Sequence, residues 1–250
     1  MFIKLRINSR INFHFLNIVK LHATTSTNDE LKSRLRESVL PHLTTIYTLE
    51  QTQGKGQRGA SWVSEKGKNL TFSTLLRDMP SGITPFQINK IISVSIVEWL
   101  KKELQIQAKI KWPNDILSVQ HKLAGILIEN SFSGSVFSHS VVGIGLNVNQ
   151  ETFEGLSKAI SLKNITGRNF NLEELLWSFL KVLQNNLRDP LRVAQDYNKH
   201  LFKYNQITWF SSIKGDFEGL VMGTDKEGKL VLRVQNKLVT FSLKELKWMY

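Results

Sequence analysis

Cysteine is absent from the sequence, and this absence excludes disulfide bonds, thiolate nucleophiles and zinc sites built on cysteine. The six histidines are scattered, and no two of them have the four-residue spacing of a helical metal site. No segment approaches the ~20 uninterrupted apolar residues that a membrane-spanning helix needs. The sequence therefore predicts neither a histidine-based metal centre nor a membrane protein.

A targeting signal is not predicted either. The longest candidate is the N-terminal stretch up to Lys20, which Lys4, Arg6 and Arg10 interrupt and which lacks a small-residue cleavage site. We therefore expect a cytoplasmic protein.

The net charge of +12 indicates an anionic partner, which could be nucleic acid, a nucleotide or an acidic protein. The basic residues are spread along the chain, and from Asn205 onward seven Lys and Arg stand against five Asp and Glu. Because no arm or run concentrates the charge, charge alone does not choose among these partners.

The length of 250 residues and the apolar fraction of 41% are typical of a globular chain with one medium domain and a small one. Residue periodicity predicts helices over 27–39, 84–104, 171–189 and 190–204, and strands over 44–51, 69–76, 108–112, 122–130 and 139–149. Thr27 and Glu30 have the spacing of a capping box. We predict an α+β fold, with a mixed sheet flanked by helices in residues 1–204 and a small β-barrel-like module in residues 205–250.

A glycine-rich stretch, "EQTQGKGQRGASW" at 50–62, lies between two predicted strands. It matches neither a phosphate-binding Walker A loop nor a dinucleotide fingerprint, because it precedes a strand where those motifs open a helix. Glycine backbone N–H groups can approach an anion closely, and Lys55 and Arg58 add charged donors. An anion site and an ordinary hairpin loop remain equal alternatives for this stretch.

Two further motifs are weak when taken singly. In "KIKWPNDI", Pro113 favours extended geometry at Trp112, so that the turn gathers Lys111, Asn114 and Asp115, with Lys122 at the start of the next strand. Taken alone, a plain hairpin turn explains this better than a binding site. In "GIGLNVN" at 143–149, the two glycines of the strand mark either a close approach to a ligand or a bulge.

The joint order of these motifs, with "TSTND" ahead of them and "SLKNITG" at 161–167 behind them, resembles the biotin-protein ligase family. The resemblance covers 25–166 and extends weakly into the C-terminal module. It implies a catalytic biotin/ATP-binding domain of the class II synthetase type in 1–204 and an SH3-like β-barrel in 205–250. It also implies that ATP and Mg²⁺ activate biotin to biotinyl-5'-AMP, and that the biotinyl group passes to one lysine of a biotin carboxyl carrier protein or domain.

The resemblance also assigns site residues. Those that bind biotin would be Ser26, Thr27, Gln51, Gly54, Lys55 and Lys122. Those that bind ATP or the adenylate would be Gly56, Gln57, Arg58, Trp62, Lys111, Asn114 and Asn147, with Asn114 also near Mg²⁺. The catalytic residues would be Lys122, Asp115, Lys111 and Arg58, where Asp115 orients or deprotonates the acceptor lysine.

Two departures from the family pattern affect these expectations. Lys55 and Gln57 replace two arginines of the loop, so the bidentate fork is lost at one position and the charge at the other. Retention of the adenylate would then depend more on Lys122 and Arg58. Only 25 residues precede Ser26, which is too short for the DNA-binding domain of the repressor members, so we expect a monofunctional ligase that does not bind DNA.

Two alternatives and one open question remain. A lipoate or octanoate ligase or transferase shares the broad fold, although the absence of cysteine argues against its cysteine-dependent members. A basic nucleic-acid-binding protein would need aromatic stacking platforms in the C-terminal module, where the candidates are Trp209, Phe210, Phe217, Phe241, Trp248 and Tyr250. The sequence leaves a homodimer open.

Overall fold

The structure, a computed structural model, describes residues 16–80, 82–243 and 245–250. Most of the N-terminal stretch considered as a targeting signal lies outside the described residues. The chain divides into two compact units: the first contains the residues up to Gly82 and Leu123–Leu180, and the second contains Ile83–Lys122 and Lys181–Tyr250. The boundary near residue 205 stays a prediction.

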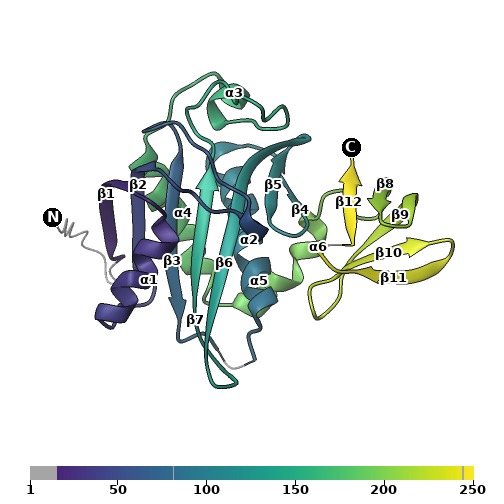
Figure 1. Cartoon of the computed structure of the whole chain (residues 1–250), viewed down its shortest axis with the longest axis horizontal. Coiled ribbons are helices and arrows are strands. Elements are labelled where there is room, and N and C mark those ends of the chain that lie inside the picture. Colours follow the sequence, from purple (N-terminus) through teal and green to yellow (C-terminus); the bar gives the residue numbers. More distant parts are fainter. Residues whose placement is uncertain (1–15, 81, 244) are drawn as a thin grey trace. The chain divides into compact units, whose positions relative to one another are not determined.

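The first unit is built on a mixed sheet (Figure 1). Its strands follow the order β1 (Ile18–Thr24), β2 (Thr45–Gln51), β3 (Leu70–Arg77), β7 (Val136–Leu146) and β6 (His121–Ser133). Strands β1 and β2 are parallel, and the other neighbours are antiparallel. The prediction of a mixed sheet is confirmed, but β1 was not predicted, because an edge strand with a partly exposed surface has little regular alternation.

Helices cover both faces of this sheet. On one face, Leu31 of α1 (Thr27–Glu37) packs in a cluster with Leu75 of β3. On the other face, Phe179 of α4 (Leu172–Asn186) lies with its ring centroid 5.7 Å from that of Phe72. Neighbouring residues of a strand point to opposite faces, so β3 is buried along almost its whole length. The short helix α3 (Leu162–Thr166) follows β7 in the chain.

The predicted capping box at α1 is wrong. Ser26 is the N-cap and makes no side-chain cap bond, whereas Thr27 is the first helical residue. Its backbone N–H donates to Gln51 Oε1 at 2.9 Å, so an orphan donor of the first turn is satisfied from β2 and not from within the helix. Glu30 pairs instead with Arg34, four residues later on α1.

The second unit is organised around α2 (Pro85–Leu104), which begins as predicted. Thr84 and Gln87 form a capping box at its start, and most of the helix is buried. Helices α5 (Pro190–Gln195) and α6 (Tyr197–His200) pack against it. The single helix predicted over 190–204 is therefore wrong, because the backbone after α6 extends and pairs with β4, where the Phe202 N–H donates to the Ile110 carbonyl.

A hairpin and an antiparallel sheet complete the second unit. Strands β4 (Lys109–Lys111) and β5 (Asp115–Ser118) form the hairpin. The C-terminal sheet has the order β11-β10-β9-β8-β12 and consists of β8 (Ile207–Ser212), β9 (Gly215–Thr224), β10 (Leu230–Val234), β11 (Lys237–Phe241) and β12 (Leu246–Met249). The predicted β structure of residues 205–250 is confirmed. Closure into an SH3-like barrel stays a prediction.

Among the described residues, no helix combines the length and the apolar character needed to cross a membrane.

Candidate active site

The start of α1 and the end of β2 bring two predicted biotin-binding residues into contact. Thr27 lies against Gln51 through its backbone N–H, at 2.9 Å, and its hydroxyl, at 3.3 Å. Ser26 and Thr27 are both buried, and the Ser73 hydroxyl of β3 lies 2.7 Å from Thr27 Oγ1. The sequence analysis missed Ser73, because nothing local marks a strand serine that faces a helix start. The result is a small set of hydrogen-bonding groups inside an apolar layer.

The two glycines of β7 make room for side chains from elsewhere in the first unit. A Cβ atom on Gly143 would lie 2.4 Å from Asn28 Oδ1, and one on Gly145 would lie 2.2 Å from the Trp62 ring. The pairing of β7 with β3 and β6 runs through both glycines without a shift of register. The bulge alternative is therefore wrong. The close approach is made by Asn28 and Trp62.

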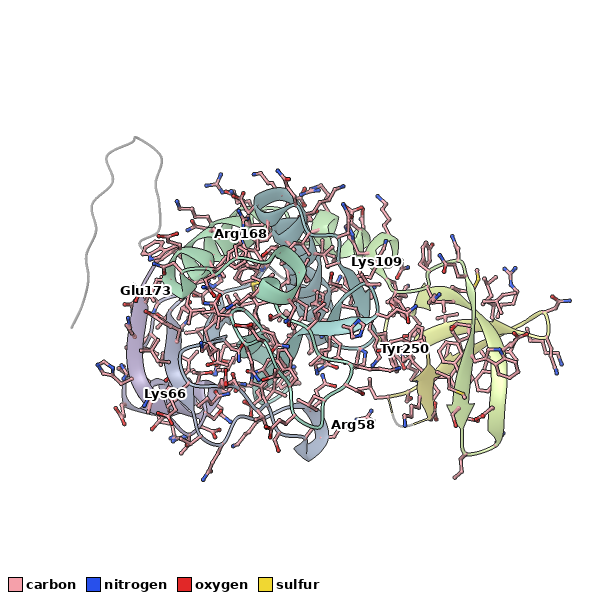
Figure 2. The ribbon with its side chains drawn as sticks, turned by 90° about the horizontal axis from the view of Figure 1, so that it is seen from above. Arg58, Lys66, Lys109, Arg168, Glu173 and Tyr250 are labelled. Atoms are coloured by element: carbon pink, nitrogen blue, oxygen red, sulfur yellow. The ribbon has the colours of Figure 1, made fainter. Side chains whose placement is uncertain are left out.

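The glycine loop, residues 52–68 between β2 and β3, is closed at its base by backbone hydrogen bonds. The Trp62 N–H donates to the Gly54 carbonyl at 2.9 Å, and the Gly56 N–H donates to the Ala60 carbonyl. A Cβ atom on Gly54 would lie 2.2 Å from the Trp62 carbonyl oxygen, so this position requires glycine. Gln57 and Arg58 lie on a single 3₁₀ turn at the tip of the loop, where Figure 2 labels Arg58.

An ion-pair network ties this loop to α1. The Lys55 ammonium lies 2.5 Å from Asp29 Oδ2, and Lys32 reaches Asp29 Oδ1 at 3.0 Å and Glu129 Oε1 at 2.7 Å. Burial raises the pKa of Asp29, but hydrogen bonds from Lys55 and Lys32 outweigh it, so this pKa lies below its ordinary value. Glu129 also accepts a hydrogen bond from Asn28 Nδ2 at 2.7 Å.

Sequence reasoning missed the acidic members of this network. Asp29 belongs to the "TSTND" motif, and its spacing of three residues from Lys32 on one helix face is a usable signal. Glu129 lies 97 residues beyond Lys32, and no pattern in the sequence joins the two.

In the second unit, three predicted catalytic residues meet at the β4–β5 turn. Lys122 Nζ lies 2.7 Å from Asp115 Oδ1, and Lys111 Nζ lies 3.6 Å from Asp115 Oδ2. Asp115 pairs with Lys111 in the hairpin register, and Asn114 lies in the turn between them. The arrangement holds two ammonium groups around one carboxylate. It can therefore present positive charge to an anionic ligand from a fixed position.

Asn147 lies just beyond β7 and is buried. Its Nδ2 donates to the Ile160 carbonyl at 3.1 Å. Asn149 forms two hydrogen bonds with the backbone of Phe170. The strand ends at Leu146, so the prediction that both asparagines lie on it is wrong. The contact between Asn147 and adenine stays a prediction.

Comparison of the sequence with known proteins agrees with these observations. A sequence profile of the "Biotin/lipoate A/B protein ligase family" matches residues 21–147. The chain belongs to this family. As a member it is a ligase, and the resemblance identified from its motifs is confirmed.

Individual members cover most of the chain. The bifunctional ligase/repressor BirA of Bacillus spizizenii is 29% identical over 84% of this chain and 67% of its own length. The biotin–[acetyl-CoA-carboxylase] ligase of Paracoccus denitrificans is 33% identical over 52% of this chain and 57% of its own. The solved biotin protein ligase from Aquifex aeolicus, in complex with biotin and ATP, has a TM-score of 0.76 at 26% identity, and covers 93% of this chain and 98% of that one. The predicted α+β fold is confirmed.

Proposed function

We propose that this ligase uses ATP to convert biotin to biotinyl-5'-AMP and then transfers the biotinyl group to a lysine of a biotin carboxyl carrier protein or domain. The observation that carries the proposal is the convergence of Lys122 and Lys111 on Asp115. The biotin carboxylate and the phosphates of ATP are all anionic and repel one another. Preorganised ammonium groups offset that repulsion without reorganising during the reaction.

The first step joins a biotin carboxylate oxygen to the α-phosphorus of ATP, and pyrophosphate leaves. We assign charge stabilisation in this step to Lys122 and Lys111, whose positions Asp115 fixes. Thr27 and Gln51 in the first unit supply hydrogen-bonding groups of the kind that the polar ring of biotin requires, next to an apolar layer that suits its carbon chain.

In the second step, the neutral amine of the carrier lysine attacks the biotinyl carbonyl carbon. An amide forms, AMP leaves, and the amine proton must be accepted by a base. We assign the orientation of the incoming ammonium group to Asp115. Its carboxylate oxygens can accept a hydrogen bond from the amine N–H of that lysine.

The protein groups at the turn fit a magnesium ion that arrives with ATP. Mg²⁺ is usually bound by one or two protein oxygens together with phosphate oxygens and water. No group of three or more acidic or histidine side chains converges anywhere in the described ranges. The Asn114 amide oxygen would supply a protein oxygen, and the ion would neutralise phosphate charge.

Several finer predictions remain. An acidic carrier domain as partner accounts for the net charge of +12. The absence of DNA binding stays a prediction, because one of the relatives is a ligase and repressor. The cytoplasmic location and the homodimer also stay untested. Against the nucleic-acid alternative, Phe210 and Trp248 are buried, and therefore cannot stack on bases.

The deciding experiment is the intact mass of a purified apo biotin carboxyl carrier domain. The domain is incubated with the protein, MgATP and an equimolar mixture of biotin and lipoate. We expect an ATP-dependent gain of one biotinyl group. A lipoyl gain would move the chain to the lipoate branch of the family, and no gain with several carrier domains would contradict the proposal.

A further inference from the structure

Trp112, the residue before the Pro113–Asp115 segment, is held at two points by the C-terminal part of the chain. Its indole Nε1–H donates to the Gly228 carbonyl at 2.8 Å. Its own carbonyl accepts a hydrogen bond from Trp248 Nε1 at 3.2 Å. Trp112 is only 2% exposed, so water cannot take the place of a lost hydrogen bond, and breaking either bond costs free energy.

Both partners are themselves fixed. Trp248 on β12 is paired with Phe210 of β8, and their ring centroids lie 4.8 Å apart. Phe202 packs against the same indole at 5.7 Å. Gly228 lies in the β9–β10 turn, whose shape is set by two backbone N–H groups that donate to Asp225 Oδ1. Groups held on rigid elements can position a neighbour accurately.

The same part of the chain also reaches the lysine on the other side of Trp112. The Lys111 ammonium lies 5.3 Å from the centroid of the Tyr250 ring, which is a cation–π contact. Tyr250 follows β12 and is labelled in Figure 2. Lys111 and Asp115 pair with each other in the hairpin, so the positions of both depend on the segment that Trp248 and Tyr250 hold.

We propose that Trp248 and Tyr250 are positioning residues for Lys111 and Asp115, so that the C-terminal β sheet sets the geometry of the turn that carries the chemistry. The proposal rests on the proposed function for its kinetic consequence, but not for its structural one. It gives the C-terminal sheet a role that does not require any of its residues to touch a substrate.

The test compares two identical substitutions in the same sheet. Trp248→Phe removes the indole donor and keeps a ring, whereas Trp209→Phe changes a half-exposed tryptophan on the adjacent strand. Amide hydrogen exchange of residues 111–116 is measured in both full-length variants, after thermal unfolding has shown that both fold. We expect exchange about fivefold faster in Trp248→Phe only, as the loss of one buried hydrogen bond predicts.

Kinetic measurements distinguish a failure of the positioning proposal from a failure of the proposed ligase function. For Trp248→Phe we expect kcat of biotin adenylation to fall about tenfold, because displaced charges stabilise the transition state less, while KM for biotin stays unchanged. If the unsubstituted protein adenylates no acid, the proposed function fails and the exchange result still stands. Equal exchange in the two folded variants would overturn the positioning proposal.

A second pair of variants keeps the test decisive if Trp248→Phe does not fold. Tyr250→Leu removes the ring beside Lys111, and Tyr250→Phe retains it. We expect kcat to fall severalfold in the leucine variant and to recover in the phenylalanine variant, since the cation–π contact needs only the ring. Equal kcat values for leucine and phenylalanine would contradict the role of Tyr250.

Discussion

The glycine loop and the β4–β5 turn carry the two sets of predicted site residues, and they are held in different ways. Lys55 in the loop is half exposed, and it is tied to α1 by an ion pair with Asp29. Trp112 in the turn is buried and hydrogen-bonded at both ends. Exposed ion pairs contribute little, whereas buried hydrogen bonds are costly to break. One segment can therefore open for a ligand while the other keeps its charges in place.

The largest effect is expected at the turn. Lys122→Ala should lower the rate of biotin adenylation by about 10²- to 10³-fold, the usual result of removing one donor that stabilises developing charge. Pyrophosphate release in the presence of biotin and MgATP measures this rate. Lys101→Ala, on the exposed end of α2, is the matched control and should adenylate normally. A parental rate in Lys122→Ala would remove this residue from the mechanism.

The next prediction tests whether Gly145 of β7 must leave space for the Trp62 ring. Gly145→Ala would place a Cβ atom 2.2 Å from the Trp62 ring, and overpacking of this kind costs about 1–3 kcal/mol of the free energy of unfolding. Urea denaturation measures this loss. The double variant Gly145→Ala/Trp62→Leu should regain part of it, because the smaller side chain relieves the clash. Additive losses in the double variant would show that the two positions do not interact.

A smaller effect is expected at the loop. Asp29→Asn removes the partner of Lys55, so trypsin should cleave after Lys55 and Arg58 a few times faster, while the free energy of unfolding changes by less than about 1 kcal/mol. Glu30→Gln is the control, because Glu30 pairs with Arg34 on the same helix. Equal cleavage rates in the two variants would mean that Asp29 does not hold the loop.

The smallest effect is a pH dependence of the same contact. The pKa of Asp29 is lowered in the folded protein, so its ion pair stabilises the closed loop above the ordinary value near 3.8 and is lost as the pH falls through the lower folded value. The chain has no cysteine, so Arg58→Cys carries a single fluorescent label. Label mobility should stay constant from about pH 7 to 5 and rise below about pH 4. The additional Asp29→Asn substitution should abolish that rise.

Local patterns were sufficient to predict much of the fold. The helix starts near residues 84 and 190 and the apolar strands are predicted from neighbouring residues, and the structure has them. The cap of α1 was predicted wrongly because the N–H of Thr27 is satisfied by Gln51, 24 residues away. Long-range partners leave no mark in a local pattern, so the sequence could not show that Asn28 and Trp62 fill the space above Gly143 and Gly145.

The candidate site likewise has residues that the sequence predicts and residues that it does not. The order of the motifs identified the family and drew attention to Lys111, Asp115 and Lys122, which lie close enough in the chain to be related by one hairpin. The ion-pair network that ties the glycine loop to α1 could not be predicted from the sequence, because Glu129 and Asn28 are 101 residues apart. The hydrogen bonds of Trp112 were not visible either, since its partners lie 116 and 136 residues further along.

The sequence separation of Trp112 and Trp248 also sets a delay between their syntheses on the ribosome. At a synthesis rate of about 5–20 residues per second, 136 residues correspond to roughly 7–27 s between the appearance of the two indoles on the ribosome. During that interval the nascent chain already carries Lys111, Asp115 and Lys122, but the bond that fixes the Trp112 carbonyl cannot form. The geometry of this turn is therefore complete only after Trp248 has been synthesised, well after the charged residues that it positions.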